Sequence, residues 1–243
     1  MTCLSDNRLL VADHLERSVK LIDTTSRTVA CSTLLSADPC GICMYDDGTA
    51  LVALPMKNLI QFIKIDGKTL KLDKTLRVSG YIQGITTCRE NIVVSYADPL
   101  GVEMLSRTGS LEVRIDNTTA GREAFRSPWY LTTSTDQQSI YVSDWITHMI
   151  IRLDNRLQIL QTFSDDLLRL PAGITAISYD EILVADHDSN AIVSLQPSTG
   201  ACKKLLGKED GIDYPRAIAY SPTQKTLYVS SMYRSSVQAY KHE

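Results

Sequence analysis

Short apolar stretches rich in β-branched residues recur along the whole chain, and each contains a Val followed by Ala or Ser. The six copies begin at Val11, Val52, Val94, Val142, Val184 and Val229, so their spacings are 41, 42, 48, 42 and 45 residues. Together the copies extend from one end of the sequence to the other. A period of this size, with strand-like sequence around each copy, is typical of a repeat architecture.

The fourth repeat shows the internal layout of one unit. Tyr130 to Thr133 and Ser139 to Ser143 are predicted as two strands separated by a polar turn. His148 to Leu153 and the alternating segment Leu157 to Phe163 are predicted as the third and fourth strands. Four short antiparallel strands in about 40 residues make a propeller blade. The sequence therefore predicts an all-β fold, a six-bladed β-propeller of four-stranded antiparallel blades, with residues 1–243 as a single domain.

Both ends of the chain fall short of a complete blade. Met1 to Ser5 aligns with a first strand, and the last repeat stops after Ser236 to Tyr240 without a fourth strand. We therefore expect the chain to be excised from a longer protein whose preceding residues supply the missing outer strand. The third strand of the last blade would then be an unpaired edge in this chain.

Composition limits the classes of partner without changing the fold prediction. The hydrophobic fraction of 44% and the charged fraction of 22% are ordinary for a soluble globular protein. A net charge of −3 gives no global basic field for nucleic acid or acidic lipid. No apolar run approaches the roughly 20 residues that cross a bilayer, and the N-terminus lacks the basic and apolar regions of a signal peptide. We expect a cytoplasmic protein that binds no membrane and no cofactor.

Three segments of the repeats carry a family resemblance: Leu10 to Asp13, Tyr141 to Trp145 and Leu183 to Asn190 look like NHL repeats. Over its whole length the chain is similar to the degenerate NHL-type, six-bladed TolB-like propellers at the C-terminus of tripartite-motif proteins. In that family the propeller follows a RING, B-boxes and a coiled coil. The resemblance implies that it is the substrate- or RNA-recognition end of a ubiquitin ligase.

The chain itself is not expected to be an enzyme. It has no RING or B-box zinc spacing, no nucleophile motif and no Gly-rich phosphate loop. Any ubiquitin ligase activity of a parent protein would come from a RING domain absent here. Any self-association would likewise come from an absent coiled coil.

One face of the predicted propeller is the expected binding surface. It carries the loops that join second to third strands together with the segments that join successive blades, and these include the longest irregular segments of the chain. Function commonly resides in loops held by a rigid scaffold, and Trp, Tyr and Arg anchor protein interfaces. The candidate binding residues in these loops are Lys57, Arg126, Trp129, Trp145, Arg169, His187, Tyr214, Arg216, Tyr233 and Arg234.

The charge of this face favours a protein or peptide ligand over RNA. Its loops hold eight basic and thirteen acidic residues, and RNA affinity depends on neutralising phosphates. RNA binding through the region of Arg126, Arg169, Arg216 and Arg234 remains the alternative. The first three lie near equivalent blade entries, and the bases would stack on Trp129, Trp145 and Tyr214. A third interpretation is structural: the arginines bridge neighbouring blades to adjacent Asp residues.

A metal-dependent lactonase or lyase is the remaining alternative. Such an enzyme needs carboxylates, Asn or His around the central channel. The predicted inner strands contain none of these residue types. His14 and His187 occupy matching places in the first and fifth repeats, whereas His148 and His242 are out of register. We interpret His14 and His187 as hydrogen-bonding repeat residues and predict no metal site.

Overall fold

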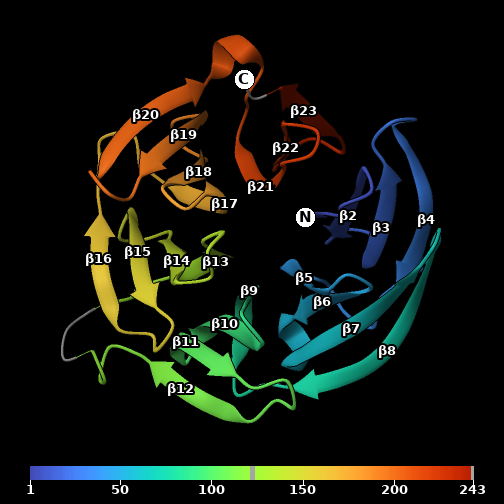
Figure 1. Ribbon diagram of the computed structural model, residues 1–243, viewed down its shortest axis with the longest axis horizontal. Coiled ribbons are helices and arrows are strands. Elements are labelled where there is room, and N and C mark those ends of the chain that lie inside the picture. Colours follow the sequence, from blue (N-terminus) through green and yellow to red (C-terminus); the bar gives the residue numbers. More distant parts are fainter. Residues whose placement is uncertain (121–123, 242–243) are drawn as a thin grey trace.

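The strands of the computed structural model form six antiparallel sheets arranged as a ring around a central axis (Figure 1). The structure describes residues 1–120 and 124–241. Within these residues five sheets have four strands, and the sheet nearest the C-terminus has three. Each sheet is built from strands consecutive in sequence, so each is one blade. The predicted six-bladed β-propeller is therefore confirmed.

The first three blades follow the first three repeats. Blade one comprises β1 (Thr2–Cys3), β2 (Arg8–Asp13), β3 (Ser18–Asp23) and β4 (Thr28–Leu34). Blade two comprises β5 (Ile42–Asp46), β6 (Thr49–Leu54), the 3₁₀ turn η1 (Pro55–Lys57), β7 (Leu59–Asp66) and β8 (Thr69–Arg77). Blade three comprises β9 (Tyr81–Cys88), β10 (Asn91–Asp98), β11 (Leu100–Leu105) and β12 (Leu111–Ile115).

The last three blades follow in the same order. Blade four comprises β13 (Pro128–Thr133), β14 (Ser139–Asp144), β15 (Met149–Asp154) and β16 (Ile159–Phe163). Blade five comprises β17 (Pro171–Ser178), β18 (Glu181–Asp186), β19 (Ala191–Gln196) and β20 (Ala201–Leu206). The turn η2 (Lys208–Asp210) leads into blade six, which comprises β21 (Pro215–Ser221), β22 (Thr226–Ser231) and β23 (Val237–Lys241).

Two candidate binding residues expected in loops lie in inner strands instead. Trp129 is the second residue of β13, and Arg216 is the second residue of β21. The reason is that the first strand of these blades begins at the opening proline, because Pro128 already pairs with Asp144 and Pro215 with Ser231. Proline is tolerated as the first residue of a strand.

The repeated Val forms the centre of the core in most blades. The Val side chains of blades two to six are fully buried. Each second strand packs against neighbouring blades, as in the cluster that joins Ile140 and Val142 of blade four to Val93 and Val102 of blade three. Because both faces of every sheet are covered by a neighbour, the second strands are apolar at consecutive positions rather than at alternating ones.

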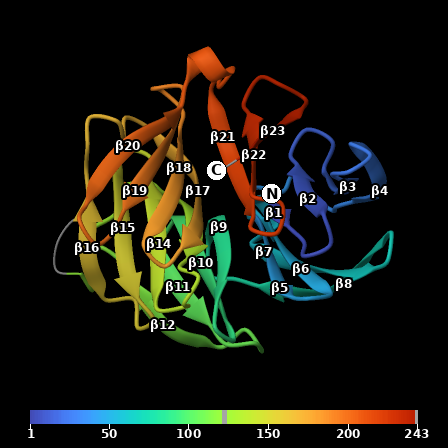
Figure 2. The ribbon, with the colours of Figure 1, turned by 45° about the horizontal axis from the view of Figure 1, so that its top comes forward.

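Blade six closes the ring directly against blade one. Leu9 of β2 packs with Ala219 of β21 and Tyr228 of β22, and the amide of Gln224 donates to the hydroxyl of Thr24 at 3.0 Å. In the tilted view β1 lies beside β21 (Figure 2), in agreement with their contacts. The sheet of blade six ends at β23, so the predicted three-stranded last blade is confirmed.

In the described part of the chain no helix is long and apolar enough to cross a membrane.

Candidate functional site

Five of the predicted binding residues form a continuous row of rings across blades four, five and six. Successive ring centroids are 4.9 Å apart from Trp129 to Trp145, 5.4 Å from Trp145 to His187, 5.1 Å from His187 to Tyr214 and 5.3 Å from Tyr214 to Tyr233. Trp129 comes from β13, and Tyr214 comes from the segment between blades five and six. The other three rings come from loops between second and third strands. We call these five side chains the aromatic row.

A cation covers the inner end of the aromatic row. The guanidinium carbon of Arg216 lies 5.5 Å from the centre of the Trp129 ring, which is within cation–π range. The Tyr130 ring stacks almost parallel to the Trp129 ring at 6.1 Å. Burial raises the pKa of the Tyr130 phenol, and the nearby Arg216 guanidinium partly opposes this rise in pKa. Arg216 and Tyr130 therefore support the row at this end.

The row passes from a covered end to an open end. His187 in its centre is 8% exposed, whereas Tyr214 is 37% and Tyr233 is 71% exposed. The Tyr233 ring meets the Tyr214 ring edge to face, at an interplanar angle of 85°. A ligand can therefore reach the row most directly at blade six.

A buried aspartate fixes the loop that carries Trp145. One oxygen of the fully buried Asp144 carboxylate accepts the backbone N–H groups of Arg126 and Ser127, at 2.8 and 2.9 Å. The other oxygen accepts those of Ile146 and Thr147, at 3.2 and 3.0 Å. This Asp thereby connects the segment entering blade four to the loop after its second strand.

The equivalent aspartate of blade five arranges the loop of His187. Asp186 is also fully buried, and it accepts the backbone N–H groups of Leu170 and Ser189 at 2.8 and 2.9 Å. At the end of the same loop the Asn190 side chain accepts the backbone N–H of Tyr214 at 2.7 Å. The Tyr214 backbone has a φ of 44°, which is uncommon for a bulky residue. Asn190 therefore holds Tyr214 against blade five.

Glycines of the inner strands allow neighbouring blades to approach the backbone of the site. A Cβ placed on Gly84 would lie 2.1 Å from the carbonyl oxygen of Trp129. A Cβ on Gly173 would lie 2.7 Å from the carbonyl oxygen of Arg216. In addition, the Ser95 hydroxyl donates to the Trp129 carbonyl at 2.9 Å. Blades three and five thus position the strand residues of the site through their backbone.

The other predicted basic residues have local surroundings of their own. Arg169 is exposed, and its Nε donates to the carbonyl of Asp166 at 3.3 Å. The Arg234 guanidinium lies 3.7 Å from the Asp213 carboxylate. Arg126 is exposed on the segment before β13, and Lys57 is exposed on η1 of blade two, outside the aromatic row. Two residues counted on this face, Arg122 and Glu123, lie outside the described residues, as does His242.

Exposed apolar side chains mark the tips of the loops on the same face, and of these only Tyr233 was predicted from the sequence. The residue four places after each repeat Val is Leu15, Met56, Ile146 or Tyr233 in blades one, two, four and six, and Asp98 or Asp188 in blades three and five. The four apolar tips are 92%, 71%, 51% and 71% exposed, in that order. Aligning the repeats on their Val would have revealed this pattern.

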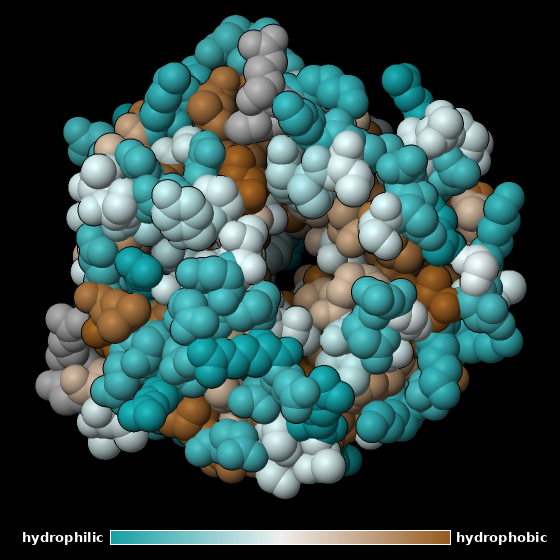
Figure 3. Space-filling view, viewed as in Figure 1, coloured by the Kyte–Doolittle hydropathy of each residue, from teal (hydrophilic) through white to brown (hydrophobic). Residues whose placement is uncertain are grey.

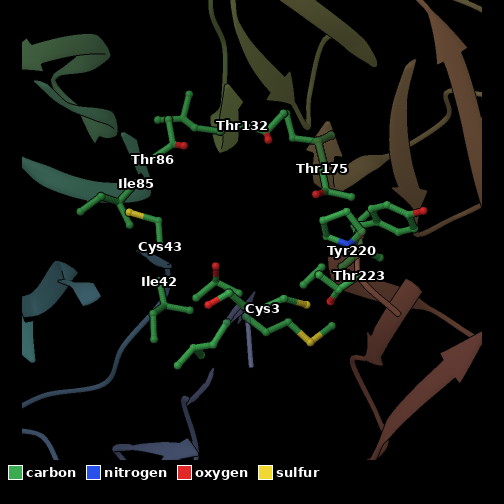
Figure 4. A pocket seen from close by; sticks show the side chains of 18 residues that line it. Cys3, Ile42, Cys43, Ile85, Thr86, Thr132, Thr175, Tyr220 and Thr223 are labelled. Atoms are coloured by element: carbon green, nitrogen blue, oxygen red, sulfur yellow. The ribbon is translucent and has the colours of Figure 1, made fainter. Parts of the chain in front are cut away.

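The centre of the ring is a narrow channel, seen as a hollow in the space-filling view (Figure 3). A cavity of about 380 Å³ lies within it, and its lining contains no Asp, Glu or His. Thr86, Thr132 and Thr175 surround this cavity (Figure 4), and each pairs with the residue just before a repeat Val. Burial raises the pKa of the Cys43 thiol in the same wall to about 12, so this sulfur stays protonated.

The histidines in matching places make hydrogen bonds, as predicted. Nδ1 of His14 lies 3.3 Å from the carbonyl of Pro39, and Nδ1 of His187 lies 3.1 Å from the carboxylate of Asp188. Within residues 1–120 and 124–241, no group of three or more His, Cys, Asp or Glu side chains is arranged to hold a metal ion.

Comparison with known proteins supports the fold. No protein-family model matches the chain, and no curated protein shows a significant sequence match. Among solved structures, a streptogramin B lyase has 14% identity over 100% of this chain and 82% of its own, with a TM-score of 0.73. A functionally unknown protein from Desulfotomaculum acetoxidans DSM 771 has 15% identity over 98% of this chain and 76% of its own, with a TM-score of 0.70.

A third structure is the Cps50 (Swd1) β-propeller domain of Myceliophteria thermophila. It has 11% identity over 98% of this chain and 81% of its own, with a TM-score of 0.70. At these identities the similarity shows a shared propeller fold and nothing about chemistry.

Proposed function

We propose that this chain is a non-catalytic recognition module that binds a protein or peptide through the aromatic row. The row carries the proposal, because it joins residues from three blades on one face and ends in exposed tyrosines. Tyr and Trp bury a large area at low conformational cost, and they are frequent hot spots of protein interfaces. The apolar loop tips extend this surface around the ring, and clusters of exposed apolar groups commonly mark interaction sites.

We further propose that the module is an NHL-type propeller that recruits substrates for a tripartite-motif ubiquitin ligase. One feature of the fold supports this proposal. The Asp that follows Val-Ala or Val-Ser in the resembling repeats accepts backbone N–H groups and thereby holds the loops of the binding face. The ligase chemistry would come from a RING domain in another part of such a protein.

RNA binding is the second candidate, and one contact favours it. The Arg216 guanidinium over the Trp129 ring is an arrangement on which a base can stack. Two features argue against RNA binding. The face has more acidic than basic residues and its loop tips are apolar, and neither attracts phosphate.

The test begins with a display library of random linear peptides selected on the purified propeller. We expect Tyr233→Ala to weaken a selected peptide about tenfold, because Tyr233 is an open ring with little of its surface in the fold. Thermal stability should stay nearly unchanged. Tyr179→Ala is the matched control, since Tyr179 is 74% exposed in the turn between β17 and β18 on the opposite face.

Equal loss of affinity in both variants, or in neither, would contradict the assignment of the site. Single-stranded RNAs tested in parallel, with salt varied, separate the second candidate. If the propeller binds RNA and no peptide is selected, RNA binding replaces peptide recognition as the function of this face.

A further inference from the structure

The open end of the aromatic row lies among acidic loops. The segments 164–170, 186–190, 207–216 and 231–236, which carry or adjoin this part of the row, contain seven Asp or Glu and four Lys or Arg. Two of the carboxylates adjoin the row directly. Asp188 follows His187, and its side chain is 57% exposed; Asp213 precedes Tyr214, and its side chain is 41% exposed. The electrostatic potential at this end therefore favours a cation.

Asp188 fixes the His187 ring in the middle of the row. Nδ1 of His187 donates to the Asp188 carboxylate, which only accepts, at 3.1 Å. Nε2 is buried without a hydrogen-bond partner among the described residues. The His187 side chain is 10% exposed and packs between Trp145 and Tyr214.

Arg234, which faces Asp213, leaves that carboxylate with spare acceptor capacity. The Arg234 nitrogen is 3.7 Å from the Asp213 oxygen, which is longer than a hydrogen bond. Both side chains are more than 40% exposed, so their attraction is weakened by water. A ligand cation can therefore share Asp213 with Arg234 or displace it.

The protein already shows a cation bound to the other end of the row. Arg216 lies over the Trp129 ring, and an aromatic face attracts a guanidinium through its quadrupole. At the open end the exposed Tyr214 and Tyr233 rings offer the same kind of surface, with carboxylates beside them. The two ends thus share one chemistry, but at the open end the cation of the chain, Arg234, lies near the Asp213 carboxylate, and among the described residues no cation lies over the Tyr214 or Tyr233 ring.

We propose that the open end of the aromatic row binds an Arg or Lys side chain of the partner peptide, which lies on the exposed surface of the Tyr214 and Tyr233 rings with Asp188 and Asp213 as its counter-charges. This inference rests on the proposed function and names the ligand class of that site. The excess of carboxylates would repel an acidic or phosphorylated peptide, and it would repel each phosphate of an RNA.

The first experiment uses peptides selected on the wild-type propeller. We expect a basic residue at one fixed position in the selected sequences, and we expect its replacement by Gln in a synthetic peptide to lower affinity about tenfold or more. Selected peptides that lack a basic residue would overturn the inference and leave the proposed function standing. If no peptide is selected, both are overturned.

The second experiment uses variants of the propeller. Asp188→Asn and Asp213→Asn should each weaken the basic peptide about three- to tenfold, and the loss should shrink at high salt. Asp47→Asn is the matched control, since it removes one carboxylate from an exposed turn of the opposite face. Tyr233→Phe should retain affinity, because the ring face remains. Circular dichroism and thermal midpoints confirm folding, and equal affinities of the Asp188, Asp213 and Asp47 variants would overturn the inference.

Discussion

At the scale of single residues, the buried aspartates show how a repeat motif becomes a binding face. Asp144 and Asp186 lie at the ends of second strands, where they accept backbone N–H groups from two segments each. Blade three has no Asp at this place. There the buried Glu103 accepts the Tyr96 and Ser79 hydroxyls, and it also pairs with Arg114 at 2.6 Å. In blade three the buried carboxylate thus binds side-chain donors, whereas Asp144 and Asp186 bind backbone N–H groups.

Asp144→Ala should therefore lower the free energy of unfolding by about 3 kcal/mol, because four backbone N–H groups lose their acceptor in a buried place. It should also weaken peptide binding, since the loop that carries Trp145 loses its anchor. Urea denaturation measures the first effect and fluorescence anisotropy the second. The exposed Asp47→Ala variant should change neither quantity, and an Asp144→Ala variant as stable as the wild type would contradict this account.

At the scale of elements, the inner strands do more than line the channel. Gly41 just before β5, Gly84 in β9 and Gly173 in β17 occupy equivalent positions. Each faces the inner strand of the next blade. At Gly84 and Gly173 that neighbour is the backbone of Trp129 or Arg216. The absence of a side chain at these glycines therefore sets the place of two site residues that belong to other blades.

Gly84→Ala should destabilise the protein by about 2 kcal/mol, because the new methyl group would overlap the Trp129 carbonyl unless blades three and four move apart. Affinity for the selected peptide should fall as well, since Trp129 moves with β13. Gly48→Ala is the matched control, because a Cβ there would meet its nearest atoms at 3.9 and 4.0 Å. Similar unfolding midpoints for the two variants would show that the close approach of Gly84 to the Trp129 carbonyl does not affect the free energy of unfolding.

At the scale of the whole molecule, aspartates in the turns around the ring make stability depend on pH. On the face opposite the aromatic row, aspartates in short turns accept hydrogen bonds from backbone N–H groups or from nearby hydroxyls. Backbone N–H groups of Ser26 and Thr25 lower the pKa of Asp23. The hydroxyl of Ser134 does the same for Asp136, and the hydroxyl of Ser198 for Asp180.

Because these pKa values are lower in the folded protein than in the unfolded chain, the carboxylates stabilise the fold above about pH 4. Their contribution is lost as the pH falls below that value and the folded protein takes up protons. We expect the urea midpoint to fall steadily between about pH 5 and about pH 3. A triple variant with Asn at positions 23, 136 and 180 should show a shallower fall, and an unchanged slope would contradict this source of acid sensitivity.

The sequence by itself determined the number of blades, the order of the strands and the face on which the loops gather. These features follow from local patterns, because a period near 40 residues, β-branched runs and turn residues act within each repeat. The residue types of the site were also predictable, because Trp, Tyr and Arg commonly anchor interfaces and both tryptophans of the chain belong to the segments of this face.

Only the tertiary structure decided which of these residues meet. Trp129, Trp145, His187, Tyr214 and Tyr233 are spread over 105 positions of the sequence, and no local rule relates their rings. They form one row because three blades turn by a fixed step about the axis, which brings a strand residue, loop residues and an interblade residue to the same height. Lys57 stands outside the row for the same reason, since blade two lies elsewhere on the ring. Proximity across a closed ring is a property of the packing between sheets, which no single repeat encodes.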